Sequence, residues 1–213
     1  TGSSVVTGDL GIWPNTASSI TGFPPGIVVG AVLPGNAVAM QAQSDLSSAY
    51  NDLAGRACDT VLTGIDLGGL VLGPGVYCFT STAQLTGNLI LDAQGNADAL
   101  FIFQIGSSLT SASNASVELI NGGLNCNVYW QVGSSATLGT TTNFAGSILA
   151  LTSITLNTGA AVSGRLLART GAVTLDTNDA AICTAAPPML SVVKSVNPNP
   201  VATASSAVYT VVV

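Results

Sequence analysis

The residues of this chain that could do acid–base or nucleophilic chemistry are few and scattered. Ten acidic residues accompany one lysine (Lys194) and three arginines, and histidine is absent. Glycoside hydrolysis needs two neighbouring carboxyl groups, and a catalytic serine or cysteine needs a base beside it. Asp176 and Asp179 lie near each other without a histidine or lysine close by, so we expect them to form turn hydrogen bonds. The sequence therefore predicts a protein that is not an enzyme and that uses no cofactor.

The four cysteines also lack the spacing of a metal site. They stand at Cys58, Cys78, Cys126 and Cys183, without a CxxC pair. Zinc sites combine such pairs with histidine, so we expect no bound metal. An even number of cysteines favours two disulfides and an oxidising compartment, which predicts a secreted or cell-surface protein; four buried thiols are the alternative. Three pairings are open, and closeness in the chain favours Cys58 with Cys78, which leaves Cys126 with Cys183.

The composition limits the classes of partner. The chain has 213 residues, of which 47% are hydrophobic and 7% charged, and its net charge is −6. Ordinary globular proteins are about 25% charged, so the surface here must consist largely of Thr, Ser, Asn and Gly. A chain without a basic patch is a poor partner for nucleic acid or an anionic membrane. Membrane-spanning helices need about 18 or more consecutive apolar residues, and we find no such run.

Threonine-centred motifs recur at a regular interval in the second half of the chain. Gln104–Ser108 is repeated as Gln131–Ser135, 27 residues later. The tripeptides Ala136-Thr137-Leu138, Ile154-Thr155-Leu156 and Val173-Thr174-Leu175 then follow at steps of 18 and 19 residues. Three strands of about five to six residues make one coil of a three-sided β-solenoid, which fits this period. We therefore predict a mainly β, solenoid fold.

The alternation within these strands predicts a column of outward threonines. Apolar neighbours of each Thr point inward, and coils of a solenoid stack about 4.7–4.9 Å apart, so Thr137, Thr155 and Thr174 should align with Ser135 and Ser153 beside them. Apolar–Thr–Gly tripeptides suggest equivalents in the first half at Thr7, Thr21, Thr63 and Thr86, together with Ser19 two residues before Thr21. Glu118, between Val117 and Leu119, aligns with the same column and would disturb it. Stacked threonines also stabilise sheets without a ligand, which is the alternative role for each of them.

Residues 37–54 contain neither Gly nor Pro and predict one helix. Asn36 suits its N-cap and Gly55 its end. An apolar stripe follows helical spacing: Val38, Ala42, Leu46, Ala49, Tyr50 and Leu53. A solenoid has no room inside for a helix, so we expect the helix to pack on an outer face, against Leu149 and Leu167.

The composition changes at Pro187-Pro188. We predict one domain over residues 1–186, followed over 187–213 by a linker and the truncated start of a β-sandwich-like repeat module. In the full-length protein, further repeat modules could follow it.

Residues 1 to 184 contain a further series of sequence motifs that follow one another in a fixed order. The most characteristic are Val6-Thr7-Gly8-Asp9-Leu10-Gly11, Leu72-Gly73-Pro74-Gly75-Val76-Tyr77, Asn127-Val128-Tyr129-Trp130-Gln131-Val132-Gly133 and Gly164-Arg165-Leu166-Leu167-Ala168. In these motifs the chain resembles the microbial ice-binding (antifreeze) proteins. The resemblance implies a discontinuous, right-handed β-solenoid with an adjacent helix. It also implies a protein that binds ice crystals through a flat Thr/Ser-rich face and inhibits ice growth or recrystallisation, alone or within a cell-surface ice adhesin.

The resemblance extends to the Thr column. A Thr-small-x-Thr pattern is linked to ice contact in the family, and Thr152-Ser153-Ile154-Thr155 is similar to it. The second functional hypothesis is an adhesin or carbohydrate-binding solenoid that does not bind ice. Trp13, Tyr129 and Trp130 could stack on sugars in that case, although the alternation around Trp130 places it in the core.

Overall fold

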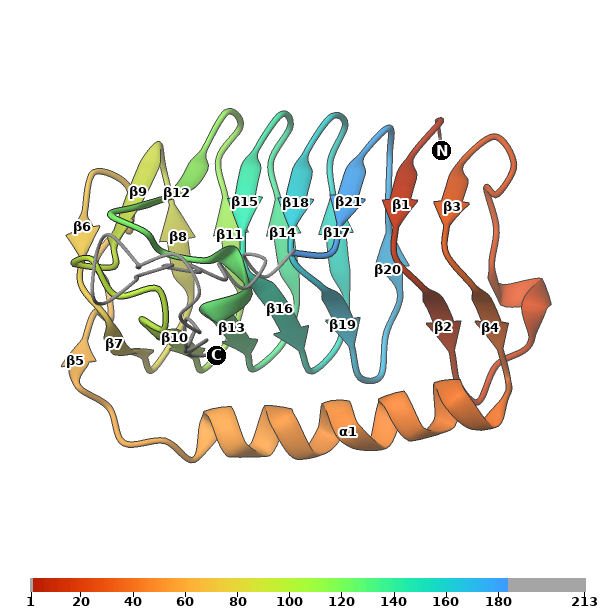
Figure 1. Ribbon diagram of the computed structural model, residues 1–213, viewed down its shortest axis with the longest axis horizontal. Helices are drawn as coiled ribbons and strands as arrows, with labels where there is room; N and C mark the ends of the chain where they lie inside the picture. Colours follow the sequence, from red (N-terminus) through yellow and green to blue (C-terminus); the bar gives the residue numbers. More distant parts are fainter. Residues whose placement is uncertain (1, 184–213) are drawn as a thin grey trace, which may run out of the picture.

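The computed structural model describes residues 2–183, which form a β-solenoid with one long helix along its side (Figure 1). This confirms the predicted mainly β, three-sided solenoid. The predicted second module, residues 187–213, lies outside the described residues.

Three large parallel sheets form the sides of the solenoid. The eight-stranded sheet has the order β3 (Ile27–Val29), β1 (Val5–Thr7), β21 (Asp179–Ala181), β18 (Ala161–Ser163), β15 (Asn143–Ala145), β12 (Ser116–Ile120), β9 (Asn88–Asp92) and β6 (Val71–Leu72). The six-stranded sheet has the order β19 (Leu166–Ala168), β16 (Ser147–Ala150), β13 (Val128–Val132), β10 (Phe101–Ile105), β7 (Gly75–Phe79) and β5 (Thr60–Val61). The five-stranded sheet has the order β20 (Val173–Thr174), β17 (Ile154–Leu156), β14 (Ala136–Leu138), β11 (Leu109–Ser111) and β8 (Ala83–Leu85).

Each coil of the chain visits the six-, five- and eight-stranded sheets in turn. The strand registers reproduce the sequence periods, because Phe101 pairs with Val128, Thr137 with Thr155, and Thr155 with Thr174. The coil that begins at Phe101 is longer than the next one. Residues 121–127, with the short 3₁₀ helix η2 (Asn125–Asn127), are inserted in it after β12.

The solenoid is discontinuous in sequence. Strand β1 pairs with β21 on one side and with β3 on the other, so the first residues stack onto the last coil. A small sheet of β2 (Leu10–Ile12) and β4 (Val32–Pro34) belongs to the same N-terminal coils, with the 3₁₀ helix η1 (Ala17–Ser19) between β2 and β3. Helix α1 (Ala37–Ala54) then runs along the stack to its opposite end, where β5 begins (Figure 1).

Helix α1 begins and ends where the sequence predicts. The Asn36 side chain accepts a hydrogen bond from the N–H of Ala39, and Gly55 is the C-cap. Leu46, Tyr50 and Leu53 pack on the six-stranded sheet against a surface that includes Leu149 and Leu167, as expected. Ala42 and Ala49 of the predicted stripe are exposed. At the first turn, Ala39 is buried and Val38 is 60% exposed. At the other end, the Gln104 side chain donates to the carbonyls of Leu53 and Arg56 and fixes the helix terminus to β10.

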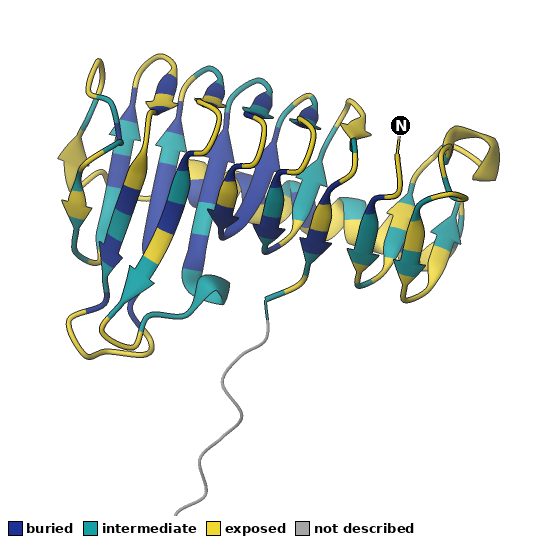
Figure 2. Ribbon diagram, turned by 90° about the horizontal axis from the view of Figure 1, so that it is seen from above, coloured by how far each residue is buried: buried dark blue, intermediate teal, exposed yellow. Residues whose placement is uncertain are grey.

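The core consists of the inward side chains of the three sheets. Buried residues follow one another along the strands of successive coils (Figure 2). At the centre of the core, Phe103 and Trp130 stack on successive coils with their ring centroids 3.9 Å apart. Phe144 lies on the same coil as Trp130, and their ring centroids are 4.8 Å apart. Trp130 is completely buried and donates its indole N–H to the carbonyl of Ala145, so it belongs to the core as predicted.

Two disulfides join elements that are distant in the chain. Cys58 pairs with Cys78 and ties the segment after α1 to β7. Cys126 pairs with Cys183 and ties η2 to the residues that follow β21. This is the pairing that closeness in the chain favours.

The corner between the five- and eight-stranded sheets places two threonines in the left-handed backbone region. Equivalent positions in successive coils are Asn114 (φ 59°), Thr141 (φ 55°), Gly159 (φ 74°) and Thr177 (φ 57°). Asn and Gly adopt this conformation readily, whereas β-branched residues rarely do.

Thr141→Asn is therefore expected to raise the free energy of unfolding by about 1 kcal/mol, because strain at such positions costs on the order of 1–3 kcal/mol. The reciprocal change Asn114→Thr should lower it by a similar amount. Chemical denaturation of both variants checks this. The Thr141→Asn substitution also removes the hydroxyl that donates to the Asn114 side chain and to the Thr140 carbonyl, so the gain is a net value. Equal stabilities for Thr141→Asn and the wild type would contradict the prediction.

Candidate functional site

The three sides of the solenoid differ in how far they are open to solvent. Helix α1 covers the six-stranded sheet. The eight-stranded sheet carries Glu118 and Asp179 on its outer side, and the segment with η2 crosses it through an Asn125–Ser163 hydrogen bond and the Cys126–Cys183 disulfide. The five-stranded sheet has no such cover among the described residues, and we therefore examine it as the candidate site.

A column of polar side chains follows the middle of the five-stranded sheet. Strand pairing aligns Gln84, Thr110, Thr137, Thr155 and Thr174 on successive coils. The strand neighbours of Gln84, Thr110, Thr137 and Thr155 are buried, for example Ile154 and Leu156 on either side of Thr155, so the column points outward. On the last coil, Val173 beside Thr174 is 40% exposed. The predicted alignment of Thr137, Thr155 and Thr174 is thus present in the fold.

Two more columns of hydroxyl residues lie beside the first, towards the corner with the six-stranded sheet. One precedes the strands by a single residue and consists of Thr82, Ser108, Ser135 and Ser153. The other is Ser81, Ser107, Ser134 and Thr152, whose backbones hydrogen-bond in sequence from coil to coil. We call these three columns together the hydroxyl face. Its thirteen positions carry twelve hydroxyl groups, one amide and no charge.

Most hydroxyls of the face are free to bind water. Within residues 2–183, the hydroxyls of Thr110, Thr137, Thr155 and Thr174 have no hydrogen-bond partner in the protein. Elsewhere the structure uses such groups internally: Thr170 donates to the carbonyl of Leu151. An uncharged, regular array of rigid β-branched side chains with free hydroxyls can order a layer of water but supplies no acid, base or nucleophile.

A carboxylate lies at the first end of the face. Asp66, before β6, accepts hydrogen bonds from the N–H groups of Gly68 at 2.7 Å and Thr86 at 2.8 Å. Burial by itself would raise the pKa of Asp66, but these donors outweigh it and hold the pKa below its ordinary value of 3.8. The ionised group thus fastens the first coil to the corner after β8.

This gives a prediction for acid stability. Since the pKa of Asp66 is lower in the folded than in the unfolded chain, its contribution is full above the ordinary pKa and is lost as the pH falls through the folded-state value. We expect the melting temperature of Asp66→Asn to fall less steeply than that of the wild type between about pH 5 and pH 2. Asp45→Asn, on the exposed side of α1, is the control for the change in net charge. Parallel melting curves for Asp66→Asn and the wild type would contradict the prediction.

The expected N-terminal equivalents do not join the hydroxyl face. Thr7 lies on β1 in the eight-stranded sheet, and Ser19 and Thr21 lie in and after η1. Thr63 lies after β5, where its hydroxyl is 3.2 Å from that of Thr80. Only Thr86, directly after β8, borders the face. The glycines of these tripeptides explain the error, because all have positive φ and mark corners that occur on any side: Gly8, Gly22, Gly64 and Gly87.

Sequence reasoning also misplaced Glu118 and missed Thr110. Glu118 lies on β12, between Leu119 and Val117, in the eight-stranded sheet, so it does not interrupt the Thr column. The residue in the column is Thr110, which sequence analysis missed together with Gln84. The repeat of Gln104–Ser108 at Gln131–Ser135 contained the signal, since the same 27-residue step relates Thr110 to Thr137.

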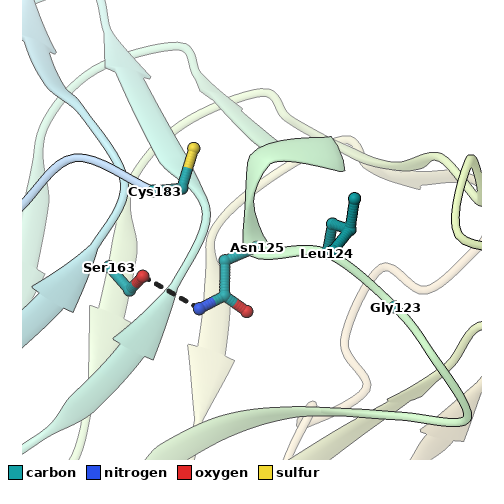
Figure 3. A pocket seen from close by; sticks show the side chains of 5 residues that line it. All are labelled: Gly123, Leu124, Asn125, Ser163 and Cys183. Atoms are coloured by element: carbon teal, nitrogen blue, oxygen red, sulfur yellow. Dashed lines mark hydrogen bonds between the residues drawn. The ribbon is translucent and has the colours of Figure 1, made fainter. Parts of the chain in front are cut away.

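A small hollow lies on the eight-stranded sheet, and a shallow one lies along the first turns of α1, beside Val38 and Asp45. The first is the more enclosed. It measures about 190 Å³ and is lined by Gly123, Leu124, Asn125, Ser163 and Cys183 (Figure 3). The Asn125 amide donates to the Ser163 hydroxyl at 2.9 Å, and none of the lining residues is charged. Among residues 2–183 we also find no group of three potential metal ligands and no helix that could cross a membrane. These observations leave the hydroxyl face as the candidate site.

Comparison with known proteins agrees with this geometry. A family model described as "Ice-binding-like" matches residues 1–181. The chain belongs to this family. Its members are proteins named for binding ice, and the family accounts for the β-solenoid with a single helix.

Several curated members of the ice-binding family are similar in sequence. The ice-binding protein of Nostoc sp. (strain HG1) is 59% identical over 179 residues, which cover 84% of this chain and 65% of that protein. Ice-binding protein 1 of Shewanella frigidimarina (strain NCIMB 400) is 38% identical over 206 residues, covering 83% of this chain and 23% of the relative. The chain thus spans less than two thirds of the length of these relatives.

Solved structures of ice-binding proteins share the fold. The protein from the Antarctic ascomycete Antarctomyces psychrotrophicus superimposes with a TM-score of 0.83 at 37% identity, over 86% of this chain and 89% of the other. An ice-binding protein from an Antarctic biological consortium gives 0.80 at 44% identity, over 86% of both chains.

Proposed function

We propose that this protein adsorbs to ice through the hydroxyl face. The observation that carries the proposal is the central column on the five-stranded sheet, where four successive threonines project free hydroxyls from an uncharged, uncovered surface. Ice offers neither charge nor a concave shape, so its recognition requires a flat array that repeats regularly. Stacked coils repeat about every 4.7–4.9 Å, and outward residues on one strand about every 6.6 Å.

Threonine suits this array for two reasons. Its branched side chain has few rotamers, so the hydroxyls hold position with little loss of entropy on binding. Each threonine also pairs a hydroxyl that hydrogen-bonds water with a methyl group that does not. Membership of the ice-binding family supports the same function, and the names of the relatives state ice binding for those proteins.

Thermal hysteresis of the purified 213-residue chain, with observation of crystal shape, tests the function. We expect a gap between the melting and growth temperatures and faceted crystals. A folded protein, checked by circular dichroism, that produces neither would reject ice binding.

The carbohydrate-binding alternative has less support from the geometry. Sugar-binding sites use exposed aromatic rings, but Trp130 is completely buried. Trp13 is 37% exposed and stands in the segment after β2 without a second tryptophan beside it in the described residues. Binding to a glycan array together with absent hysteresis would favour this alternative.

We further propose that the protein acts outside the cytoplasm, alone or as one module of a larger surface protein. Two disulfides support an oxidising compartment. Cys183 is tied to η2 over the eight-stranded sheet, away from the hydroxyl face. Thiol alkylation of protein taken directly from the source cells tests the first point, since free thiols would contradict it.

A further inference from the structure

Two buried hydroxyl residues interrupt the apolar interior behind the hydroxyl face. The inward position after each central-column residue is Leu85, Ser111, Leu138, Leu156 and Leu175 on successive coils. The residue before the next strand is Ala115, Thr142, Ala160 and Asn178 on successive coils, so Thr142 stands between two alanines. Ser111 therefore replaces a leucine and Thr142 an alanine, and their side chains are 4% and 1% exposed.

The two side chains form a small hydrogen-bond network between neighbouring coils. Their hydroxyl oxygens are 2.9 Å apart. The Ser111 hydroxyl accepts from the N–H of Gly139 at 2.9 Å, and the Thr142 hydroxyl donates to the carbonyl of Ala112 at 3.1 Å. Burying a hydroxyl group costs free energy unless it is hydrogen-bonded. Packing alone therefore does not explain why Ser111 stands in a column of leucines and Thr142 between two alanines.

This network lies where the backbone ladder is short. Strand β11 pairs with β14 only through Leu109–Ala136 and Thr110–Thr137, whereas β8–β11 and β14–β17 each pair over three residues. Strands β17 and β20, at the edge of this sheet, also share two pairs. On the other side of the corner, β12 and β15 share a single pair, Ser116–Asn143. The break coincides with the change from the 27-residue coil to the 18-residue coil.

We infer that Ser111 and Thr142 are positioning residues that hold the Thr110 coil in register with the Thr137 coil, so that the hydroxyl face is one continuous array. The inference rests on the proposed ice-binding function and names what keeps its surface regular. Neither side chain reaches the surface; both act through the backbones of Gly139 and Ala112, directly after the two strands that carry Thr137 and Thr110.

The close approach of the coils supports this role. A Cβ added at Gly139 would lie 2.5 Å from the carbonyl carbon and oxygen of Ala112. The two backbones are therefore in contact at this point, and the hydroxyl bridges replace backbone hydrogen bonds that the break removes.

The test compares Ser111→Ala with Ser147→Ala. Ser147 is a matched control, because it is 2% exposed and its hydroxyl also bridges coils by accepting from the N–H of Arg165, at 3.2 Å, but on the helix-covered sheet. We expect hydrogen exchange of the Gly139 amide to become about fivefold faster in Ser111→Ala, because the variant loses the hydrogen bond that this amide donates. Thermal hysteresis should fall at least about twofold, since the array divides into parts of two and three coils. Ser147→Ala should lose similar stability and keep its hysteresis.

Ser111→Thr retains the hydroxyl in a column that elsewhere holds leucine, and should restore both readouts. If Ser111→Ala does not fold, Thr142→Val is measured in the same way. If the wild type shows hysteresis, two results for Ser111→Ala would overturn the inference: unchanged amide exchange at Gly139, or a loss of hysteresis no greater than that of Ser147→Ala. Absent hysteresis in the wild type would instead overturn the proposed function.

Discussion

Thr155→Tyr is expected to remove most of the ice-binding activity while the protein stays folded. Thr155 is flanked on both sides by threonines of the same column, so a larger side chain here separates the neighbouring coils from a flat crystal surface. If two or three hydroxyl contacts at about 0.5–1.5 kcal/mol each are lost, adsorption weakens by roughly an order of magnitude or more. Thermal hysteresis at equal molar concentration measures this. The outward position of residue 155 predicts little change in melting temperature.

Thr7→Tyr provides the control for Thr155→Tyr. It makes the same chemical change at an exposed position on β1, in the eight-stranded sheet. We expect wild-type hysteresis from this variant. Loss of hysteresis in Thr7→Tyr, with Thr155→Tyr unaffected, would move the site to the eight-stranded sheet.

Removal of the Cys126–Cys183 disulfide should have the largest effect on stability. The bond closes a loop with a sequence separation of 57, against 20 for Cys58–Cys78. The loop entropy lost from the unfolded chain corresponds to about 4 kcal/mol for the longer loop and about 3 kcal/mol for the shorter. Denaturation in guanidinium chloride of Cys126→Ala/Cys183→Ala and of Cys58→Ala/Cys78→Ala measures both losses.

The position of the Cys126–Cys183 bond adds a second expectation. Cys183 follows β21, and the N–H of Ile182 donates to the carbonyl of Thr7, so the bond secures the joint between the last coil and the N-terminal coils. The hydroxyl face lies on another sheet, and its hysteresis should persist in Cys126→Ala/Cys183→Ala below 0 °C. A smaller loss of stability here than in Cys58→Ala/Cys78→Ala would show that loop entropy does not dominate.

Much of this fold could be predicted because its regularities are local or periodic. Helix α1 has its cap, its stop and no breaking residue within its 18 residues, and the 18- to 19-residue period repeats the same strand pattern. The alignment of Thr137, Thr155 and Thr174 follows directly from that period. The role of these residues in ice binding stays a prediction until it is measured.

The features that sequence analysis missed depend on contacts that produce no periodic pattern in the sequence. The tripeptides around Thr7, Thr21 and Thr63 indicate a corner of the solenoid, because each ends in a glycine with positive φ. A corner glycine does not identify the sheet to which the preceding threonine belongs. Thr110 escaped because residues 121–127 lengthen its coil to 27 residues. Ser111 and Thr142 look like ordinary polar residues in the sequence, and only the three-dimensional packing shows that they are buried and bonded to each other.

The discontinuous coil order has a consequence for biosynthesis. The Ser4 hydroxyl accepts from the N–H of Asn178, across 174 residues of chain, and β1 docks on β21. During synthesis from the N-terminus, β1 therefore cannot pair with β21 until nearly the whole solenoid has been made. The first strand of the chain completes its pairing late. Such pairing between distant segments slows folding and prolongs the time during which unpaired strand edges can misassemble.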